Sequence, residues 1–158
     1  MTTVLLNGRT QTFDLPDHEL LLDTLRQRCN LFSVREGCGV GACGTCTVLL
    51  DGQPASSCLL FTARLEGRTI LTSEGLGGEY DLSPVQQAFV EAAGFQCGYC
   101  TPGFVLSVQA LLNENPNPSD AEVREYLAGN LCRCGAYPNI LKAVRLAAQL
   151  KAAPAPRD

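Results

Sequence analysis

Cysteine is the residue type through which this chain could do chemistry, because nine cysteines occur in 158 residues. The first group of four follows the order C-x4-C-x2-C-x11-C in a glycine-rich stretch: Cys38, Cys43, Cys46 and Cys58. Thiolates at such short intervals can reach one centre only if the backbone curls tightly, and glycine permits this because it adopts positive φ without steric cost. The spacing is the plant-type ligand order of a [2Fe–2S] cluster, which it favours over zinc.

A second group of four cysteines has the spacing C-x2-C-x31-C-x-C: Cys97, Cys100, Cys132 and Cys134. Both pairs are expected near helix N-termini, where backbone N–H groups and the helix dipole favour thiolates and can donate hydrogen bonds to cluster sulfurs. An antiparallel bundle can place the two loops at one end. This spacing alone leaves zinc and iron–sulfur both open, since tetrahedral zinc also uses paired cysteines. Thioredoxin-like chemistry is disfavoured because no βαβ pattern surrounds the first pair.

Other residues that could do chemistry have simpler interpretations. Cys29 has no partner at ligand spacing, which favours a buried structural thiol. His18 is the only histidine, and a Rieske-type centre needs two. Arg133 stands between two possible ligands and is either structural or an electrostatic influence on a cluster. Catalytic triads and phosphate-binding loops are missing from the sequence, so we expect the chain to carry electrons and not to transform an organic substrate.

Composition excludes several classes of partner. The net charge is −4 with no basic stripe, which argues against nucleic acid. No apolar run approaches the roughly 20 residues needed to span a bilayer, so we expect no direct membrane insertion. The first residues lack the pattern of a secretory signal, which predicts a cytoplasmic location with reduced thiols.

The hydrophobic pattern changes from strands to helices along the chain. Asn-Gly and Asp-Gly dipeptides mark two hairpin turns in the first part, and Pro and capping residues mark helix starts in the second. The first part is expected to contain a hairpin over 2–15, a helix over 17–28 capped by Asp17, a hairpin over 47–58 and a strand over 68–72. The second part is expected to contain helices over 84–93, 101–113, 119–128 and 140–151, with caps at Ser83, Thr101 and Ser119. Pro138 is expected to precede the last helix.

Taken together, the two cysteine blocks resemble the small iron–sulfur subunit of the molybdenum hydroxylases, the xanthine oxidase family. The segments that match this family in order and spacing are EGCGVGACGTCTVLLDG followed by SC, then QCGYCTPG, then GNLCRCGAYPNI. The resemblance implies an α+β chain in which an N-terminal β-grasp, plant-type ferredoxin-like domain precedes a C-terminal four-helix bundle iron–sulfur domain. We expect these domains at 1–74 and 83–152, with a linker at 75–82 and a disordered tail at 153–158.

The same resemblance implies roles for the site residues. The second group of cysteines would also hold a [2Fe–2S] cluster, the one nearer the molybdenum, and the first group would hold the distal cluster. Gln96 would hydrogen-bond the pterin of the molybdenum cofactor, and Cys134 would lie against it. The molybdopterin, in its cytosine dinucleotide form, would be bound mainly by a separate large subunit that also carries the catalytic glutamate.

The function that the resemblance implies is electron transfer within a molybdenum hydroxylase. Electrons would pass from the large subunit through both clusters to an FAD-binding medium subunit, a cytochrome or another acceptor. The segment from Cys132 to Tyr137 looks similar to two-component bacterial enzymes that lack the flavin subunit, such as isoquinoline 1-oxidoreductase and cytochrome-linked aldehyde dehydrogenases. The substrate would be an N-heteroaromatic compound or an aldehyde, and a signal on another subunit could export the complex. The alternatives are a freestanding two-cluster carrier and a zinc-stapled interaction module.

Overall fold

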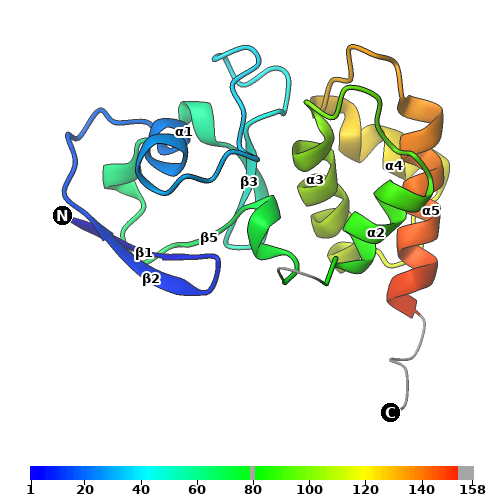
Figure 1. Ribbon diagram of the computed structural model, residues 1–158, viewed down its shortest axis with the longest axis horizontal. Coiled ribbons are helices and arrows are strands. Elements are labelled where there is room, and N and C mark those ends of the chain that lie inside the picture. The colour runs from blue at the N-terminus through cyan, green and yellow to red at the C-terminus, as the bar shows by residue number, and fades with distance from the viewer. Residues whose placement is uncertain (79–80, 153–158) are drawn as a thin grey trace.

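A five-stranded mixed sheet forms the N-terminal part of the molecule in the computed structural model, which describes residues 1–78 and 81–152 (Figure 1). The strand order is β2-β1-β5-β3-β4, and the β1–β5 pair is parallel whereas the other pairs are antiparallel. The strands are β1 (Thr2–Leu6), β2 (Arg9–Phe13), β3 (Thr47–Leu50), β4 (Gln53–Ser56) and β5 (Thr69–Leu71). The plant-type ferredoxin-like sheet that we expected is confirmed.

Both predicted hairpin turns are present. Asn7 and Gly8 have φ values of 48° and 76°, and Asp51 and Gly52 have 48° and 85°. Two successive residues with positive φ make the turn that matches the right-handed twist of the flanking strands.

The helix predicted over 17–28 is shorter and begins later. It consists of α1 (Leu21–Asp23) followed by a π-helical turn, η1 (Thr24–Arg28), and its N-cap is Leu20. Asp17 is therefore not the cap, and that prediction is wrong. The reason is tertiary: Leu20 is extended and pairs with Phe61, and the N–H of Leu21 donates to the carbonyl of Leu60 at 2.7 Å.

The C-terminal part contains four α-helices around one apolar core, which confirms the expected bundle. They are α2 (Pro84–Glu91), α3 (Thr101–Glu114), α4 (Asp120–Tyr126) and α5 (Tyr137–Ala152). Short 3-10 turns complete the chain: η2 (Ser57–Leu59), η3 (Thr62–Arg64), η4 (Ser73–Gly75) and η5 (Leu127–Gly129).

The predicted helix starts are partly right. Ser83 and Ser119 are the N-caps of α2 and α4, as expected. The capping box predicted at Ser119 is present, and Ser83 forms a second one with Gln86 that was not predicted. The cap of α3 is Cys100 and not Thr101, whose hydroxyl is buried without a hydrogen-bond partner in the described part of the chain. The prediction that Pro138 precedes the last helix is wrong: α5 begins at Tyr137, and Pro138 lies in its first turn, where the missing N–H does no harm.

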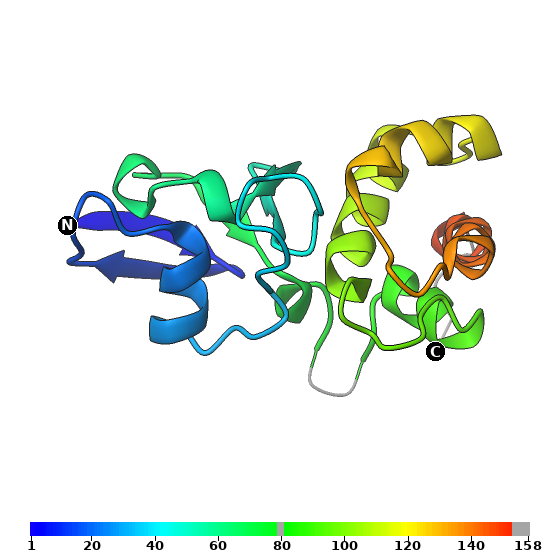
Figure 2. The same ribbon diagram turned by 90° about the horizontal axis from the view of Figure 1, so that it is seen from above.

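The sheet domain and the helical domain meet along α3. Leu49 of β3 packs against Leu106 and Ala110 of α3, and all three side chains are buried. Figure 2 shows that α3 is the helix of the bundle that faces the sheet domain. No helix within the two described ranges is long and apolar enough to cross a membrane. The expected tail and residues 79–80 of the expected linker lie outside those ranges.

Candidate metal centres

The loop of the first cysteine group curls through glycines with positive φ. Gly39, Gly41 and Gly44 have φ values of 68°, 74° and 71°. A side chain at Gly41 would overlap Leu59, and one at Gly44 would lie 2.6 Å from the carbonyl oxygen of Gly129. Only glycine satisfies both the backbone angle and the available space at these positions, as the sequence predicted.

Backbone N–H groups in this loop point at cysteine sulfur. The amides of Val40 and Ala42 donate to Sγ of Cys38 at 3.4 and 3.3 Å. These two hydrogen bonds, with a contribution from the Cys43 thiol, lower the pKa of Cys38 to about 7. A loop that stabilises a thiolate is ready to ligate a metal, because the thiolate is the metal-binding form of cysteine.

The four sulfurs of the first group lie in two pairs. The thiols of Cys38 and Cys43 interact at the outer side of the loop, where Cys38 is exposed. The inner pair, Cys46 and Cys58, is buried, and this burial, together with a hydrogen bond that the Cys58 thiol donates to Cys46, raises the pKa of Cys58 to about 11. Iron would have to offset the charge of the buried thiolates, since burial alone disfavours them.

The second group repeats this arrangement in the helical domain. Cys97 is exposed, and its pKa is lowered by the backbone N–H of Tyr99 and by the thiol of Cys134. The inner pair consists of Cys100, which is the N-cap of α3, and the buried Cys132. Burial, together with a hydrogen bond that the Cys100 thiol donates to Cys132, raises the pKa of Cys100 to about 12.

Paired sulfurs distinguish a two-iron cluster from a single ion. Across residues 1–78 and 81–152, no three Cys, His, Asp or Glu side chains are placed to share one metal ion. A single tetrahedral zinc ion needs all four thiolates around one point. A [2Fe–2S] cluster has two irons and four cysteines, so two pairs of sulfurs match it. The donor set in both loops therefore fits a [2Fe–2S] cluster better than zinc.

The remaining candidate residues lie as follows. Cys29 is half-buried against the core of the sheet domain, and this burial raises its pKa. His18 and Arg133 are exposed. Gln96 and Cys134, which the family resemblance associates with the pterin, are neighbours: the Gln96 side-chain amide donates to the Cys134 carbonyl at 3.3 Å, and both residues are exposed.

A pair of hydrogen bonds joins the two cysteine groups, and sequence reasoning did not find it. The N–H of Leu131, next to Cys132, donates to the carbonyl of Cys43 at 2.9 Å. The side chain of Asn130, which is only 6% exposed, donates to the carbonyl of Gly44 at 3.3 Å and accepts from the hydroxyl of Ser107 at 3.0 Å. The loop before α5 and the first cysteine loop are thus in direct contact, at one edge of the molecule (Figure 1).

A third link runs from the sheet domain to the loop before α3. Nη1 of Arg35 donates to the carbonyls of Gly98 and Tyr99 at 2.6 and 2.9 Å, and its guanidinium lies 5.3 Å from the centre of the Tyr99 ring. The Tyr99 hydroxyl in turn donates to the carbonyl of Glu36 at 2.6 Å. No local sequence signal marks Arg35, because its partners are more than 60 positions away.

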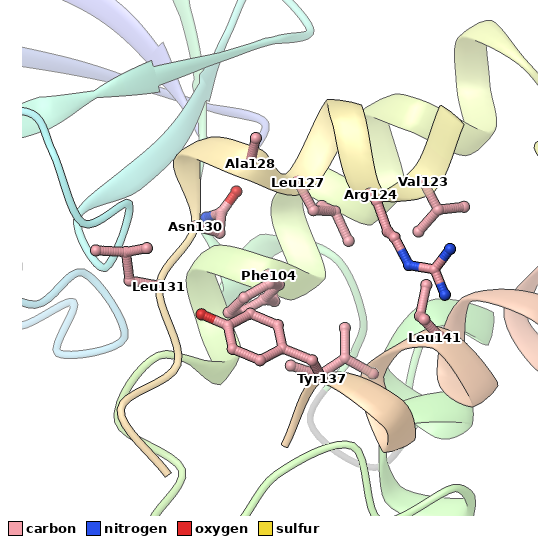
Figure 3. A pocket seen from close by; sticks show the side chains of 10 residues that line it. Phe104, Val123, Arg124, Leu127, Ala128, Asn130, Leu131, Tyr137 and Leu141 are labelled. Carbon is pink, nitrogen blue, oxygen red and sulfur yellow. The ribbon is translucent and has the colours of Figure 1, made fainter. Parts of the chain in front are cut away.

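An apolar pocket lies beside the second cysteine group, between α3, α4 and α5 (Figure 3). Its volume is about 250 Å³, and Phe104 and Tyr137 meet edge to face within it at 6.3 Å. Figure 3 shows Leu131 at the end nearest the sheet domain and Arg124 toward the other end. Among the described residues that line it, only Arg124 is charged, so this part of the pocket lacks the convergent polar groups of a substrate site.

Comparison with known proteins agrees with this geometry. A family model described as "2Fe-2S iron-sulfur cluster binding domain" matches residues 4–72, and one described as "[2Fe-2S] binding domain" matches residues 72–145. The chain is 44% identical over 144 residues to the nicotinate dehydrogenase small FeS subunit of Eubacterium barkeri. The aligned region covers 91% of this chain and 92% of that subunit.

Solved structures with the same fold include two oxidoreductases. A chain of quinoline 2-oxidoreductase from Pseudomonas putida 86 matches with a TM-score of 0.90 and 39% identity, over 94% of this chain and 93% of that one. Aldehyde oxidoreductase from Desulfovibrio desulfuricans ATCC 27774 matches with a TM-score of 0.91 and 40% identity, over 95% of this chain but only 17% of that chain. In the latter protein, a unit of this fold is one part of a much longer polypeptide.

Proposed function

This chain belongs to the family of small iron–sulfur subunits of the molybdenum hydroxylases, the xanthine oxidase family, and we propose from this how its residues serve electron transfer. As a member, it is the electron-transfer subunit of an oxidoreductase, it binds two [2Fe–2S] clusters, and it works with a larger subunit. It carries no substrate-transforming site of its own. Each cluster, when bound, accepts and releases one electron at a time.

The eight paired cysteines are the cluster ligands in this proposal. The outer and inner pairs of the first group hold the distal cluster: Cys38, Cys43, Cys46 and Cys58. Those of the second group hold the proximal cluster: Cys97, Cys100, Cys132 and Cys134. The single observation that carries the assignment is the arrangement of each group as two pairs of neighbouring sulfurs, which a two-iron cluster requires. The domains correspond to 1–74 and 83–152, joined by 75–82.

The exposed edge of the second group faces the molybdenum cofactor. Gln96 and Cys134 are adjacent there, and both are accessible to a molybdopterin bound by the large subunit, in its cytosine dinucleotide form. Hydroxylation of a substrate with an oxygen from water releases two electrons and two protons. The chain's task is to hold the path by which those electrons leave, through burial, backbone N–H groups and fixed charge.

The contact between the cysteine groups supports direct electron transfer between them. The hydrogen bond from Leu131 to Cys43 connects a residue beside one predicted ligand to another predicted ligand. We assign electron entry to the second group, which carries Gln96 and Cys134, and exit to the first, toward an FAD-binding subunit, a cytochrome or another acceptor. The substrate is an N-heteroaromatic compound or an aldehyde, a proposal supported by relatives that are named for nicotinate, quinoline and aldehyde.

Exposed apolar side chains favour an obligate subunit over a freestanding carrier. Several large ones surround the second cysteine group: Val90, Phe95, Tyr99, Leu131 and Tyr137. Side chains of this kind around one site indicate a surface that a permanent partner covers. The large molybdenum subunit is the partner that we assign to it.

Metal content of the purified complex tests the proposal. We expect four irons per small chain and one molybdenum when the chain is isolated with its partner from its own host, and flavin content would identify the acceptor. Iron without molybdenum or a large partner would instead support the freestanding carrier, and zinc in place of iron would overturn the cluster assignment.

A further inference from the structure

Arg35 belongs to the sheet domain by its backbone and to the second cysteine group by its side chain. Its N–H donates to the carbonyl of Thr45 at 3.3 Å, and its carbonyl accepts from the Thr45 hydroxyl at 3.0 Å. These bonds fix the residue at the base of the first cysteine loop. The side chain then crosses the domain boundary to the carbonyls of Gly98 and Tyr99, which lie between Cys97 and Cys100.

The link between Arg35 and Tyr99 is reciprocal. The first domain donates two hydrogen bonds to backbone carbonyls of the second, and the Tyr99 hydroxyl returns one to the carbonyl of Glu36. The guanidinium also lies over the Tyr99 ring, an arrangement that attracts a cation. Because Arg35 is half-buried and held on several sides, its positive charge has a fixed place beside the second group.

Few other charges act on this loop. Residues 95–103 contain no charged side chain, and Arg133 in the companion loop is exposed to solvent. A charge exposed to water interacts weakly with its neighbours because the solvent screens it, whereas a partly buried charge interacts more strongly.

We propose that Arg35 is a positioning residue for electron transfer, which aligns the loop before α3 with the first cysteine loop and raises the reduction potential of the cluster at the second group. Adding an electron makes a cluster more negative, so a fixed positive charge nearby stabilises the reduced form. The hydrogen bonds from Arg35 also offset the partial negative charges of the Gly98 and Tyr99 carbonyl oxygens beside the second group. This inference rests on the proposed cluster ligands.

The test is a redox titration of the assembled complex, followed by electron paramagnetic resonance of each cluster. In Arg35→Gln, we expect the second cluster to become about tenfold harder to reduce, which is about 59 mV for a one-electron couple. The first cluster should shift less, because the guanidinium lies on the carbonyls of the second loop. Arg35→Lys keeps the charge but replaces the planar guanidinium with an ammonium group, and it should remain close to the wild-type potential.

Arg26 provides a matched control within the sheet domain. Its guanidinium lies 5.6 Å from the centre of the Phe32 ring, and its Nη1 donates to the carbonyl of Val34 at 2.8 Å. Arg26→Gln therefore removes the same kinds of contact without touching the second group, and it should leave that potential unchanged.

Three results would overturn the inference: an unchanged second potential in Arg35→Gln, an equal shift in Arg26→Gln, or an Arg35→Lys potential as low as that expected for Arg35→Gln. The last comparison also serves if Arg35→Gln fails to assemble. If the wild-type complex shows fewer than two [2Fe–2S] signals, the proposed function fails as well, and that failure is visible before any variant is made.

Discussion

The two cysteine groups contain the same number of thiols but need different amounts of the fold to assemble them. Cys38 to Cys58 belong to one loop and the hairpin that follows it, all within the sheet domain. The second group combines the loop before α3 with the loop before α5, and 31 residues separate its two halves. The first group is thus organised by local backbone geometry, whereas the second depends on the packing of the helical bundle and on contacts from the sheet domain.

Removing one ligand should separate the two groups most clearly. In Cys43→Ser, we expect complete loss of the first cluster and retention of the second, because the two groups lie in different domains. The carbonyl of residue 43 remains available to Leu131, so the contact between loops persists. Iron per chain should fall from four to two, with one paramagnetic signal remaining. Loss of both signals would show that the groups are not independent, and Cys29→Ser is the control that should retain both.

The next largest effect should come from a substitution at Gly103, where α3 packs against the first cysteine loop. A side chain at Gly103 of α3 would overlap the carbonyl oxygen of Gly44, so Gly103→Ala forces the first cysteine loop and α3 apart. Overpacking of this kind costs about 1–3 kcal/mol in the free energy of unfolding. We expect urea unfolding at a lower midpoint and slower transfer between clusters, with both clusters present.

Gly129→Ala is the control for this substitution, because nothing lies within 4 Å of the added carbon. Equal unfolding midpoints for the two alanine variants would contradict the importance of the close approach at Gly103.

The smallest effect should come from Glu74, which accepts hydrogen bonds from Ser33 and Thr72 within the sheet domain. Partial desolvation raises the pKa of Glu74, a residue at the exposed surface, but hydrogen bonds from Ser33 and Thr72 outweigh it and hold that pKa below its usual value. The ionised form is therefore favoured in the folded state. Its stabilising contribution is present above the unfolded pKa of about 4.5 and is lost as the pH falls through the lower folded value.

Glu74→Gln should accordingly lower the free energy of unfolding by about 0.5–1 kcal/mol at pH 7, because solvent screens the charge of this exposed residue. The difference from wild type should shrink as the pH falls below about 4.5, where Glu74 itself becomes protonated. Urea unfolding followed by circular dichroism at several pH values measures this, with the exposed Glu125→Gln as the control. A difference that stays constant with pH would show that the charge of Glu74 is not what stabilises the fold.

Features that depend on a few neighbouring residues were predictable. The turns at Asn7-Gly8 and Asp51-Gly52 and the helix N-caps at Ser83 and Ser119 follow from local sequence, and the structure contains each of them. The start of the first helix was not predictable in the same way. Its first candidate residues pair with a distant segment near Phe61, and that competing hydrogen bonding overrides the local signal at Asp17.

The sequence by itself determined the two groups of cysteines, the tight glycine-rich loop of the first group, and the order of a sheet domain followed by a helical bundle. Cysteine spacing, glycine positions and hydrophobic periodicity indicate these features directly. Only the tertiary structure decided that the sulfurs lie in pairs, that Leu131 contacts Cys43 and that Arg35 reaches the second group. The contacts of Arg35 with Gly98 and of Leu131 with Cys43 join residues 63 and 88 positions apart. Their geometry depends on how two separately folded cores pack against each other, which no local pattern records.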